Sequence, residues 1–316
     1  MNLEKIYKEV ELLLNQLDFN ALWSGFHKFS FALYNEKETC LKHKIFPTPD
    51  SFYGNKAIWY NQEIIAIWNL ELDRIEDIDI LAVSLVHEMF HCFQMENQED
   101  RYPDDIELLF SPITSEYCSL RYQDSKLLIR SYEHPNIGIL QNIVYVRKKM
   151  IDSSPLASSN EFKAETIEGT AEYVSSKALK TLSSFKYLRR MEFYSKKLTS
   201  LDFQLDPRRR SYYSGVFLYT LFDKLSIDYK MFSGVSIFHN VMQFIKPRFI
   251  KIKNYRSIYK QIENREKEYS KEYMLMQDLI ENGKYIEFPS RIIGYDPMNM
   301  LRKNDYIFCG SYVNLS

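Results

Sequence analysis

Residues 87–91, with the sequence His-Glu-Met-Phe-His, carry the strongest chemical signal in this chain. If these residues form a helix, His87 and His91 lie one turn apart and project from the same face. Both imidazoles can then bind one tetrahedral zinc ion. Glu88 follows the first ligand and points beside the metal, where its carboxylate can accept a proton from water. The pattern predicts a zinc site with a general base. The alternative is a buried helix whose two histidines are hydrogen-bonded to neighbours.

The flanking residues predict the helix that this pattern needs. Asp77 is a suitable N-cap for a helix that runs to about Glu96. Apolar residues recur at helical spacing and form one stripe: Ile78, Leu81, Ala82, Leu85, Val86, Met89 and Phe93. The two histidines lie away from that stripe but are also flanked by apolar residues, so we expect the helix in the middle of the protein. Buried imidazoles and carboxylates need partners there, because unpaired buried polar groups are costly.

A second predicted helix, from about Asn160 to Leu182, carries three acidic residues. Glu165, Glu168 and Glu172 are spaced i, i+3, i+7 and are expected on one face, next to apolar positions. Three neighbouring carboxylates on a partly apolar helix repel one another unless a cation is near. Gly169 costs about 1 kcal/mol in a helix interior, which makes sense if another helix approaches closely there. The alternative is an exposed acidic face with an incidental glycine.

Taken together, His-Glu-Met-Phe-His and the downstream sequence Glu-Gly-Thr-Ala-Glu-Tyr (168–173) resemble the gluzincin zinc metallopeptidases, which include thermolysin-like and aminopeptidase-like families. In those families, two histidines and a glutamate from the next core helix bind zinc. The resemblance implies that Glu168 is the third ligand, and that Glu172 orients a zinc-binding histidine. The H-E-x-x-H-x-x-G-x-x-H class is excluded, because Gln94 and Asn97 occupy the positions of its glycine and third histidine.

A third segment, Tyr-Tyr-Ser-Gly at residues 212–215, resembles the Y-x-x-G helix start of aminopeptidase-like gluzincins. There, the tyrosine three residues before the glycine donates a hydrogen bond to the oxyanion of the tetrahedral intermediate. The resemblance gives this role to Tyr212, with Tyr213 as the near alternative. A phenol beside zinc can stabilise developing negative charge. Packing is the other role open to both aromatic rings.

Three arginines, Arg208, Arg209 and Arg210, come just before these tyrosines. A guanidinium can hold a substrate carboxylate bidentately, so Arg210, together with Tyr213, is a candidate for substrate contact. The alternative is a solvated basic turn after Asp206 and Pro207.

Two features depart from the gluzincin pattern. Glu168 lies 77 positions after His91 (168 minus 91), much farther than in the best-known members of the family. The inserted segment is predicted to form helices around residues 115–133 and 137–151. No G-x-M-E-N-like signature for binding a substrate amino terminus is found, so aminopeptidase activity does not follow.

Composition limits the partners and the location of the protein. The 41 Lys and Arg residues nearly balance the 42 Asp and Glu residues, so no global field favours nucleic acid or an anionic membrane surface. The four cysteines form no C-x-x-C pair, which favours reduced, mostly buried thiols. Neither a secretion signal nor an apolar run long enough to span a membrane is recognisable. We therefore expect a cytoplasmic protein.

These patterns predict an α+β fold that is mostly helical. Residues 3–17 should form a helix, and residues 57–68 a hairpin within a small N-terminal antiparallel sheet. The sheet is expected to pack on a zincin-like helical part, with the metal between two core helices. Residues 1–152 would hold the N-terminal helix, the sheet and the His-Glu-Met-Phe-His helix. Residues 153–316 would hold the third-ligand helix and a short extended C-terminal segment, unless the whole chain forms one catalytic domain.

The sequence thus predicts a zinc-dependent hydrolase, a metallopeptidase that cleaves a peptide or small amide substrate by zinc-promoted water attack. One zinc ion per chain is expected, and nothing in the sequence indicates the oligomeric state. The competing hypothesis is a non-catalytic binding or regulatory module on a gluzincin-like scaffold, with structural or absent zinc, because a fold does not fix a function.

Overall fold

The computed structural model describes residues 2–72, 75–110, 114–230, 234–252, 258–261, 264, 274–275, 277–284, 289–295, 300–303, 306–309 and 313–315. The helices in these residues are α1 (Leu3–Leu14), α2 (Phe19–Leu22), α3 (Ile78–Glu96), α4 (Asp105–Phe110), α5 (Ser115–Glu133), α6 (Ile137–Ser153), α7 (Pro155–Ala164), the π-helical turn η1 (Glu165–Gly169), α8 (Thr170–Leu182), α9 (Ser184–Leu198), α10 (Leu201–Leu205), α11 (Pro207–Lys224) and α12 (Ile237–Met242). The strands are β1 (Ser30–Tyr34), β2 (Glu38–Leu41), β3 (Lys44–Pro47), β4 (Lys56–Tyr60), β5 (Glu63–Asn69), β6 (Ile292–Tyr295), β7 (Met300–Lys303), β8 (Tyr306–Cys309) and β9 (Val313–Leu315). The predicted α+β, mostly helical fold is confirmed.

The N-terminal sheet has the strand order β3-β2-β1-β5-β4. The predicted hairpin is confirmed as β4 and β5, and its turn residues Asn61 and Gln62 have φ angles of 47° and 67°. The sheet is mixed rather than wholly antiparallel, because β1 and β5 run parallel. Tight turns fix the direction of neighbouring strands such as β4 and β5, whereas β1 and β5 are joined by a long connection that leaves their relative direction open.

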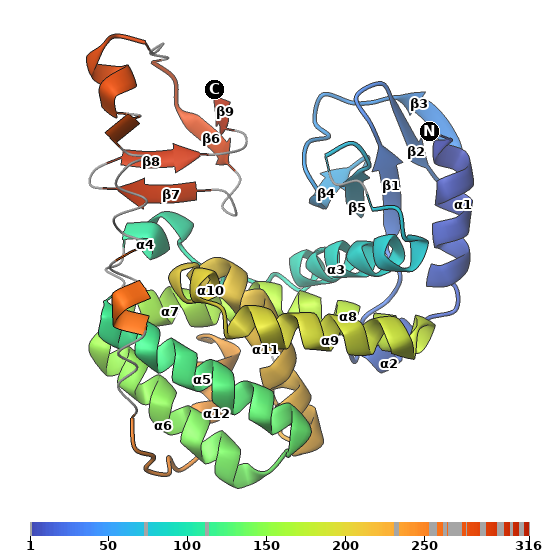
Figure 1. The fold of residues 1–316 in the computed structure, drawn as a ribbon. Helices are drawn as coiled ribbons and strands as arrows, with labels where there is room; N and C mark the ends of the chain where they lie inside the picture. The colour runs from blue at the N-terminus through green and yellow to red at the C-terminus, as the bar shows by residue number, and fades with distance from the viewer. Residues whose placement is uncertain are drawn as a thin grey trace.

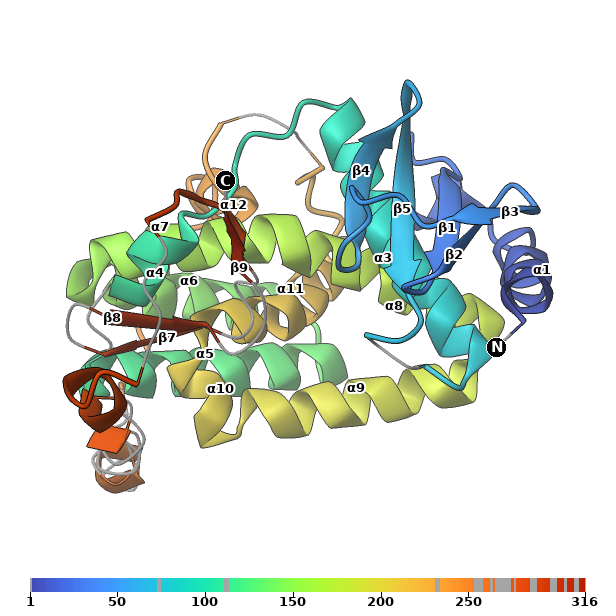
Figure 2. The ribbon, with the colours of Figure 1, turned by 90° about the horizontal axis from the view of Figure 1, so that it is seen from above.

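Helix α3 lies between the sheet and the helical part of the molecule (Figure 1). Alternate residues of β1 and β5, such as Leu33 and Trp68, join α1 and α3 in the main core. Residues of the opposite face, such as Tyr34 and Ile67, pack with Phe52 in a smaller cluster. Helix α3 is covered by the sheet on one side and by α8 on another, so it lies in the middle of the protein, as expected (Figure 2).

In the helical part, α11 crosses η1 and α8 at very close range. A Cβ atom placed on Gly169 would lie 2.9 Å from the Cα of Gly215, and one placed on Gly215 would lie 2.5 Å from the Cα of Gly169. No side chain fits between these backbones, so the close approach expected at Gly169 is confirmed, and its partner is the glycine of the Tyr-Tyr-Ser-Gly segment. The main core runs from Leu3 to Val241 and so includes residues on both sides of position 152.

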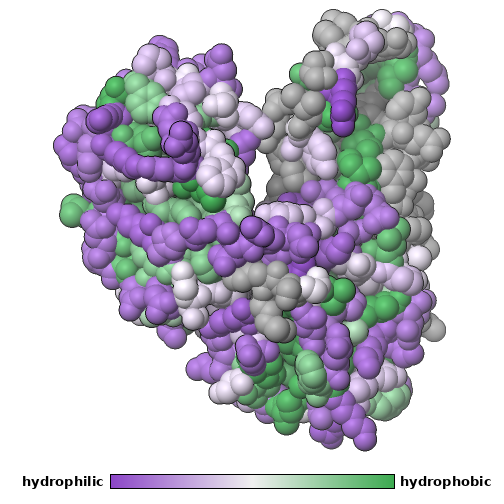
Figure 3. All heavy atoms as spheres, turned by 180° about the vertical axis from the view of Figure 1, so that it is seen from behind, coloured by the Kyte–Doolittle hydropathy of each residue, from purple (hydrophilic) through white to green (hydrophobic). Residues whose placement is uncertain are grey.

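The C-terminal strands form two small pairs, β6 with β9 and β7 with β8, and they lie beside α4 (Figure 1). They lie in the extended C-terminal segment that the sequence predicts, where β8 covers Tyr306–Cys309. From behind, the surface is notched beside the N-terminal sheet, with hydrophilic residues on the floor of the notch and both pale and hydrophobic residues on the side of the sheet (Figure 3). None of the helices in the described residues is both long and apolar enough to cross a bilayer.

Candidate metal centre

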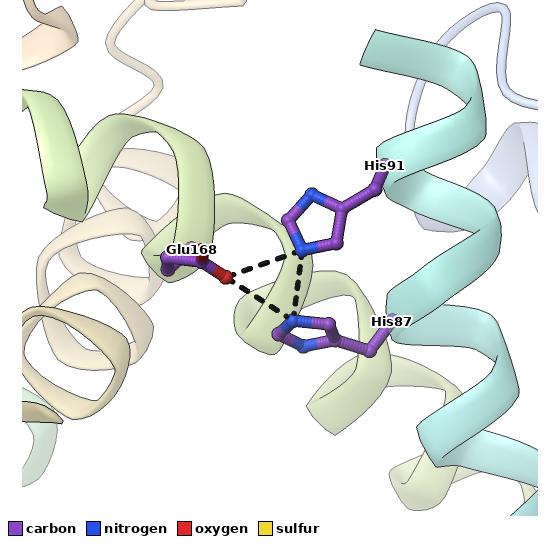
Figure 4. Close-up of side chains that lie close together, drawn as sticks. All are labelled: His87, His91 and Glu168. Atoms are coloured by element: carbon purple, nitrogen blue, oxygen red, sulfur yellow. Dashed lines mark hydrogen bonds and ion pairs between the residues drawn. The ribbon is translucent and has the colours of Figure 1, made fainter. Parts of the chain in front are cut away.

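Three side chains from two helices meet at one point: His87 and His91 from α3, and Glu168 from η1 (Figure 4). Their ligand atoms all lie within 4.8 Å of one another. The two imidazole Nε2 atoms are 3.1 Å apart, and Glu168 Oε2 lies 3.2 Å from His91 Nε2 and 3.5 Å from His87 Nε2. The predicted ligand set is therefore assembled in space, although 77 positions separate Glu168 from His91 in the chain.

The orientation of His87 is set by Glu172, as the sequence predicted. His87 Nδ1 lies 3.0 Å from Glu172 Oε2. Tyr194 donates a hydrogen bond to the other carboxylate oxygen of Glu172, and Arg190 Nη1 lies 3.6 Å from it. Burial raises the pKa of Glu172, but His87, Arg190 and Tyr194 outweigh burial and lower this pKa to about 2. Glu172 is thus an anion that accepts from His87 Nδ1–H, so the Nε2 atom of His87 faces the cluster and bears the lone pair when the imidazole is neutral.

The orientation of His91 is set by Gln94, a residue that sequence reasoning missed. His91 Nδ1 lies 2.7 Å from Gln94 Oε1. The amide nitrogen of Gln94 donates to the carbonyl of Ile167 at 2.9 Å and to Thr170 Oγ1 at 3.1 Å. The available signal was its position three residues after His91, on the same helix face. In the sequence, Gln94 stood out only as a departure from another zinc-binding pattern.

The cluster has the electrostatics of a cation site. Two imidazole Nε2 atoms and a carboxylate oxygen lie 3.1–3.5 Å from one another. Protons on the imidazoles can bridge these atoms, and when the imidazoles are neutral all three atoms can instead act as ligands of a metal ion. Burial lowers the pKa of His87, but hydrogen bonds to Glu168 and Glu172 outweigh it and raise the pKa to about 10. The surroundings therefore strongly favour positive charge at this point. The buried group His87, His91 and Glu168 could hold a metal ion.

Arg208, from the first turn of α11, is also part of the centre. Its Nη2 donates to Glu168 Oε1 at 2.8 Å, and its Nη1 donates to Asp105. This contact occupies one carboxylate oxygen of Glu168 and leaves Oε2 directed at the histidines. Asp105 also lines a hollow of about 810 Å³ whose other lining residues include Tyr102, Asp104, Glu107, Lys163 and Tyr295. The hollow is therefore connected to Glu168 through Arg208, which pairs with both Asp105 and Glu168.

Arg210 is not available to a substrate, contrary to the sequence-based expectation. Its side chain is fully buried. Its guanidinium donates to Glu161 Oε1 and to Asp124 Oδ2, both at 2.6 Å. The alternative of a solvated basic turn is wrong for Arg210 as well. Residues two positions apart lie on nearly opposite sides of an α-helix, so Arg208 and Arg210 point to different surroundings.

Tyr212 and Tyr213 also face different surroundings. The Tyr212 ring stacks on His87 with a centroid distance of 5.7 Å and an interplanar angle of 5°. Burial, followed by the charge of Glu168, holds the pKa of Tyr212 well above its ordinary value. The Tyr213 ring instead stacks on Tyr194 at 4.1 Å and on Phe203 at 5.1 Å. Tyr212 therefore lies at the centre. Tyr213, a candidate for substrate contact, instead packs against Tyr194, which donates a hydrogen bond to Glu172.

Glu88 lies next to the cluster and is 8% exposed. Burial raises the pKa of Glu88, and His91 and His87 oppose this effect in part. A buried carboxylate with a raised pKa accepts protons more readily than an exposed one, as a general base must.

Glu165 does not share the face of Glu168 and Glu172, contrary to the sequence-based expectation. It pairs with Arg147 at 2.6 and 2.9 Å. Residues seven positions apart lie on nearly the same side of an α-helix, but η1 is a π-helical turn that holds more residues per turn. The turn rotates Glu168 and Glu172 away from Glu165, so only two of the three acids reach the histidines.

Comparisons with known protein families, with curated proteins and with solved structures found no match. The chemistry of the centre is therefore inferred from its side chains.

Proposed function

We propose that this protein is a zinc-dependent hydrolase that cleaves peptide bonds and resembles the gluzincin metallopeptidases. The observation that carries the proposal is the convergence of three acceptor atoms beside the buried carboxylate of Glu88. Two imidazoles and one carboxylate are a ligand set that catalytic zinc takes, with a further position left for water or substrate. When bound there, zinc would supply Lewis-acid polarisation of a carbonyl and of water.

In this proposal, Glu88 accepts a proton from the attacking water and later delivers it to the leaving amine. Its raised pKa suits both steps. Tyr212 donates a hydrogen bond to the oxyanion that develops on the former carbonyl oxygen. The raised pKa of its phenol keeps the donated proton in place at neutral pH. Glu172 and Gln94 orient the histidines, and Arg208 orients Glu168.

The hollow beside Asp105 is the proposed place for part of the substrate, because only the Asp105–Arg208 pair separates it from Glu168. A peptide or small amide is the expected substrate class. Three of the nine lining residues are acidic and one is a lysine, so a substrate with positive charge fits somewhat better than an acidic one. The proposed location is cytoplasmic.

The test combines metal analysis with a cleavage assay. Protein purified without chelator should contain about one zinc ion per chain. The zinc-loaded protein should cleave members of a peptide library, chelation should abolish cleavage, and added zinc should restore it. An intact fold that binds no zinc on titration would overturn the proposal. Full zinc occupancy without cleavage of any peptide would favour the alternative, a binding or regulatory module.

A further inference from the structure

The side chain of Gln94 connects the two helices that carry the proposed metal ligands. It starts on α3, accepts a hydrogen bond from His91 and donates two to the stretch that carries Glu168. We propose that Gln94 is a positioning residue that fixes the tautomer of His91 and holds His91 and Glu168 in one arrangement, so that it determines metal affinity. This inference rests on the metal site of the proposed function.

The amide of Gln94 can face only one way. The carbonyl of Ile167 cannot donate a hydrogen bond, so the group 2.9 Å from it must be the amide nitrogen of Gln94. The amide oxygen therefore faces His91 Nδ1, which lies 2.7 Å away and must carry a hydrogen. In the neutral imidazole, the form that binds a metal, this is the only N–H, so His91 Nε2 bears the lone pair that points at the cluster. Gln94 thus selects the tautomer of His91 that can serve as a ligand.

The other end of Gln94 holds the turn that aims Glu168. Ile167 directly precedes Glu168 inside η1, and Thr170 begins α8 directly after this turn. Gln94 is 1% exposed, so water does not compete for these hydrogen bonds. A displacement of the amide would therefore move the imidazole and the π-helical turn at once. Glutamate cannot replace this contact, because a carboxylate has no hydrogen to donate to the Ile167 carbonyl.

The test measures zinc affinity by competition with a chromophoric chelator, and the visible absorption of the cobalt-substituted protein. Gln94→Met keeps the size of the side chain and removes both hydrogen-bonding functions. We expect zinc affinity to fall by about 10- to 100-fold, as for loss of a group that supports a metal ligand. The cobalt absorption bands should shift, because the orientation of His91 changes. A merely structural role would leave these bands in place.

Gln204→Met is the matched control. Gln204 is also 1% exposed, and its amide donates to a backbone carbonyl, that of Leu198, at 2.6 Å. This variant should lose stability without a change in zinc affinity or in the cobalt spectrum.

Gln94→Glu separates the two functions of the side chain. It keeps an acceptor for His91 but cannot donate to Ile167, so its zinc affinity should lie between those of wild type and Gln94→Met. It also tests the proposal if Gln94→Met fails to fold, because an affinity for Gln94→Glu equal to wild type would show that the link to Ile167 has no effect. A folded Gln94→Met within about twofold of wild-type affinity would overturn the inference. A wild-type protein that binds no zinc would instead refute the metal site itself, so the two failures can be told apart.

Discussion

Two groups of buried acidic residues lie along the same stretch of helix, yet their partners differ. Glu161 and Glu165, before and at the start of η1, join Asp124 in ion pairs with three buried arginines: Arg121, Arg147 and Arg210. Glu168 and Glu172 lie three and seven positions after Glu165, and they face histidines. We call the first group the ion-pair network and the second the metal centre.

The ion-pair network contains as many arginines as acids, so its charges are balanced within the protein itself. In the metal centre, each imidazole already uses Nδ1 on Glu172 or Gln94, and the two Nε2 atoms face each other at 3.1 Å. Arg190 and Arg208 pair with Glu172 Oε1 and Glu168 Oε1, whereas Glu168 Oε2 faces the two imidazoles. Buried charge alone therefore does not distinguish the two groups, but the convergence of imidazole nitrogens with a carboxylate oxygen does.

The largest expected effect separates Glu168 from Glu165. Glu168→Ala should abolish tight zinc binding and activity with it, because it removes one of three ligands. Glu165→Ala should keep zinc but lower the free energy of unfolding by about 3–5 kcal/mol, because it leaves Arg147 with an incomplete set of partners. Zinc titration and chemical denaturation of both variants make the measurement. Zinc loss in Glu165→Ala, with zinc retained by Glu168→Ala, would reverse the assignment.

Glu88→Gln should separate catalysis from metal binding. Gln has nearly the same shape but cannot accept a proton, so the variant should keep zinc and lose turnover by at least about 10²- to 10⁴-fold. The loss should appear chiefly in kcat, because the proton is transferred in the transition state. Steady-state kinetics on a cleaved peptide, with zinc content measured in parallel, provide the test. Near-wild-type turnover at full zinc occupancy would contradict the role of Glu88.

Tyr212→Phe should have a smaller effect, about 10²- to 10³-fold in kcat, which is typical for loss of one oxyanion donor. Tyr213→Phe is its neighbour-matched control and should change kcat little, because its ring packs against Tyr194 and Phe203. The same kinetic assay measures both. Equal losses in the two variants would point to a packing role for Tyr212.

The smallest expected effect is a pH dependence of the ion-pair network. Burial raises the pKa values of Asp124 and Glu161, but their arginine partners outweigh it and hold both pKa values below the ordinary values of 3.8 and 4.5. The stability from these ion pairs is therefore present above the ordinary values and is lost as pH falls through the lowered ones. Thermal unfolding of the metal-free protein should show a falling Tm below about pH 4. A Tm that stays constant in that range would argue against ionised carboxylates in the network.

The sequence predicted those parts of the molecule that depend on local signals. Asp77 caps α3 as expected, and its side chain accepts from the backbone N–H groups of Asp79 and Ile80. The helical spacing of His87 and His91 and the turn at Asn61 and Gln62 are local in the same sense. Each of these features is determined by residues that lie within one or two turns of chain.

The parts that escaped prediction depend on contacts between distant segments. No periodicity reveals that the helix changes to a π-helical turn at Glu165, so α-helical spacing predicts all three acids on one face. The Gln94 contact with Ile167 joins residues 73 positions apart, and that of Arg208 with Glu168 joins residues 40 apart. A composition of balanced charges likewise cannot tell which arginine is buried with acids in the core and which pairs with Glu168.

The contact between Gly169 and Gly215 makes the metal centre sensitive to substitution at two residues that carry no reactive group. Because a single methyl group at Gly215 would collide with the backbone of Gly169, the hydrogen atoms of two glycines set how near Tyr212 and Arg208 come to Glu168. Gly215→Ala would leave every imidazole, carboxylate and phenol in the chain and still force α11 away from them. Alanine at either position therefore requires the two backbones to move apart, which would shift the side chains of α11 relative to Glu168.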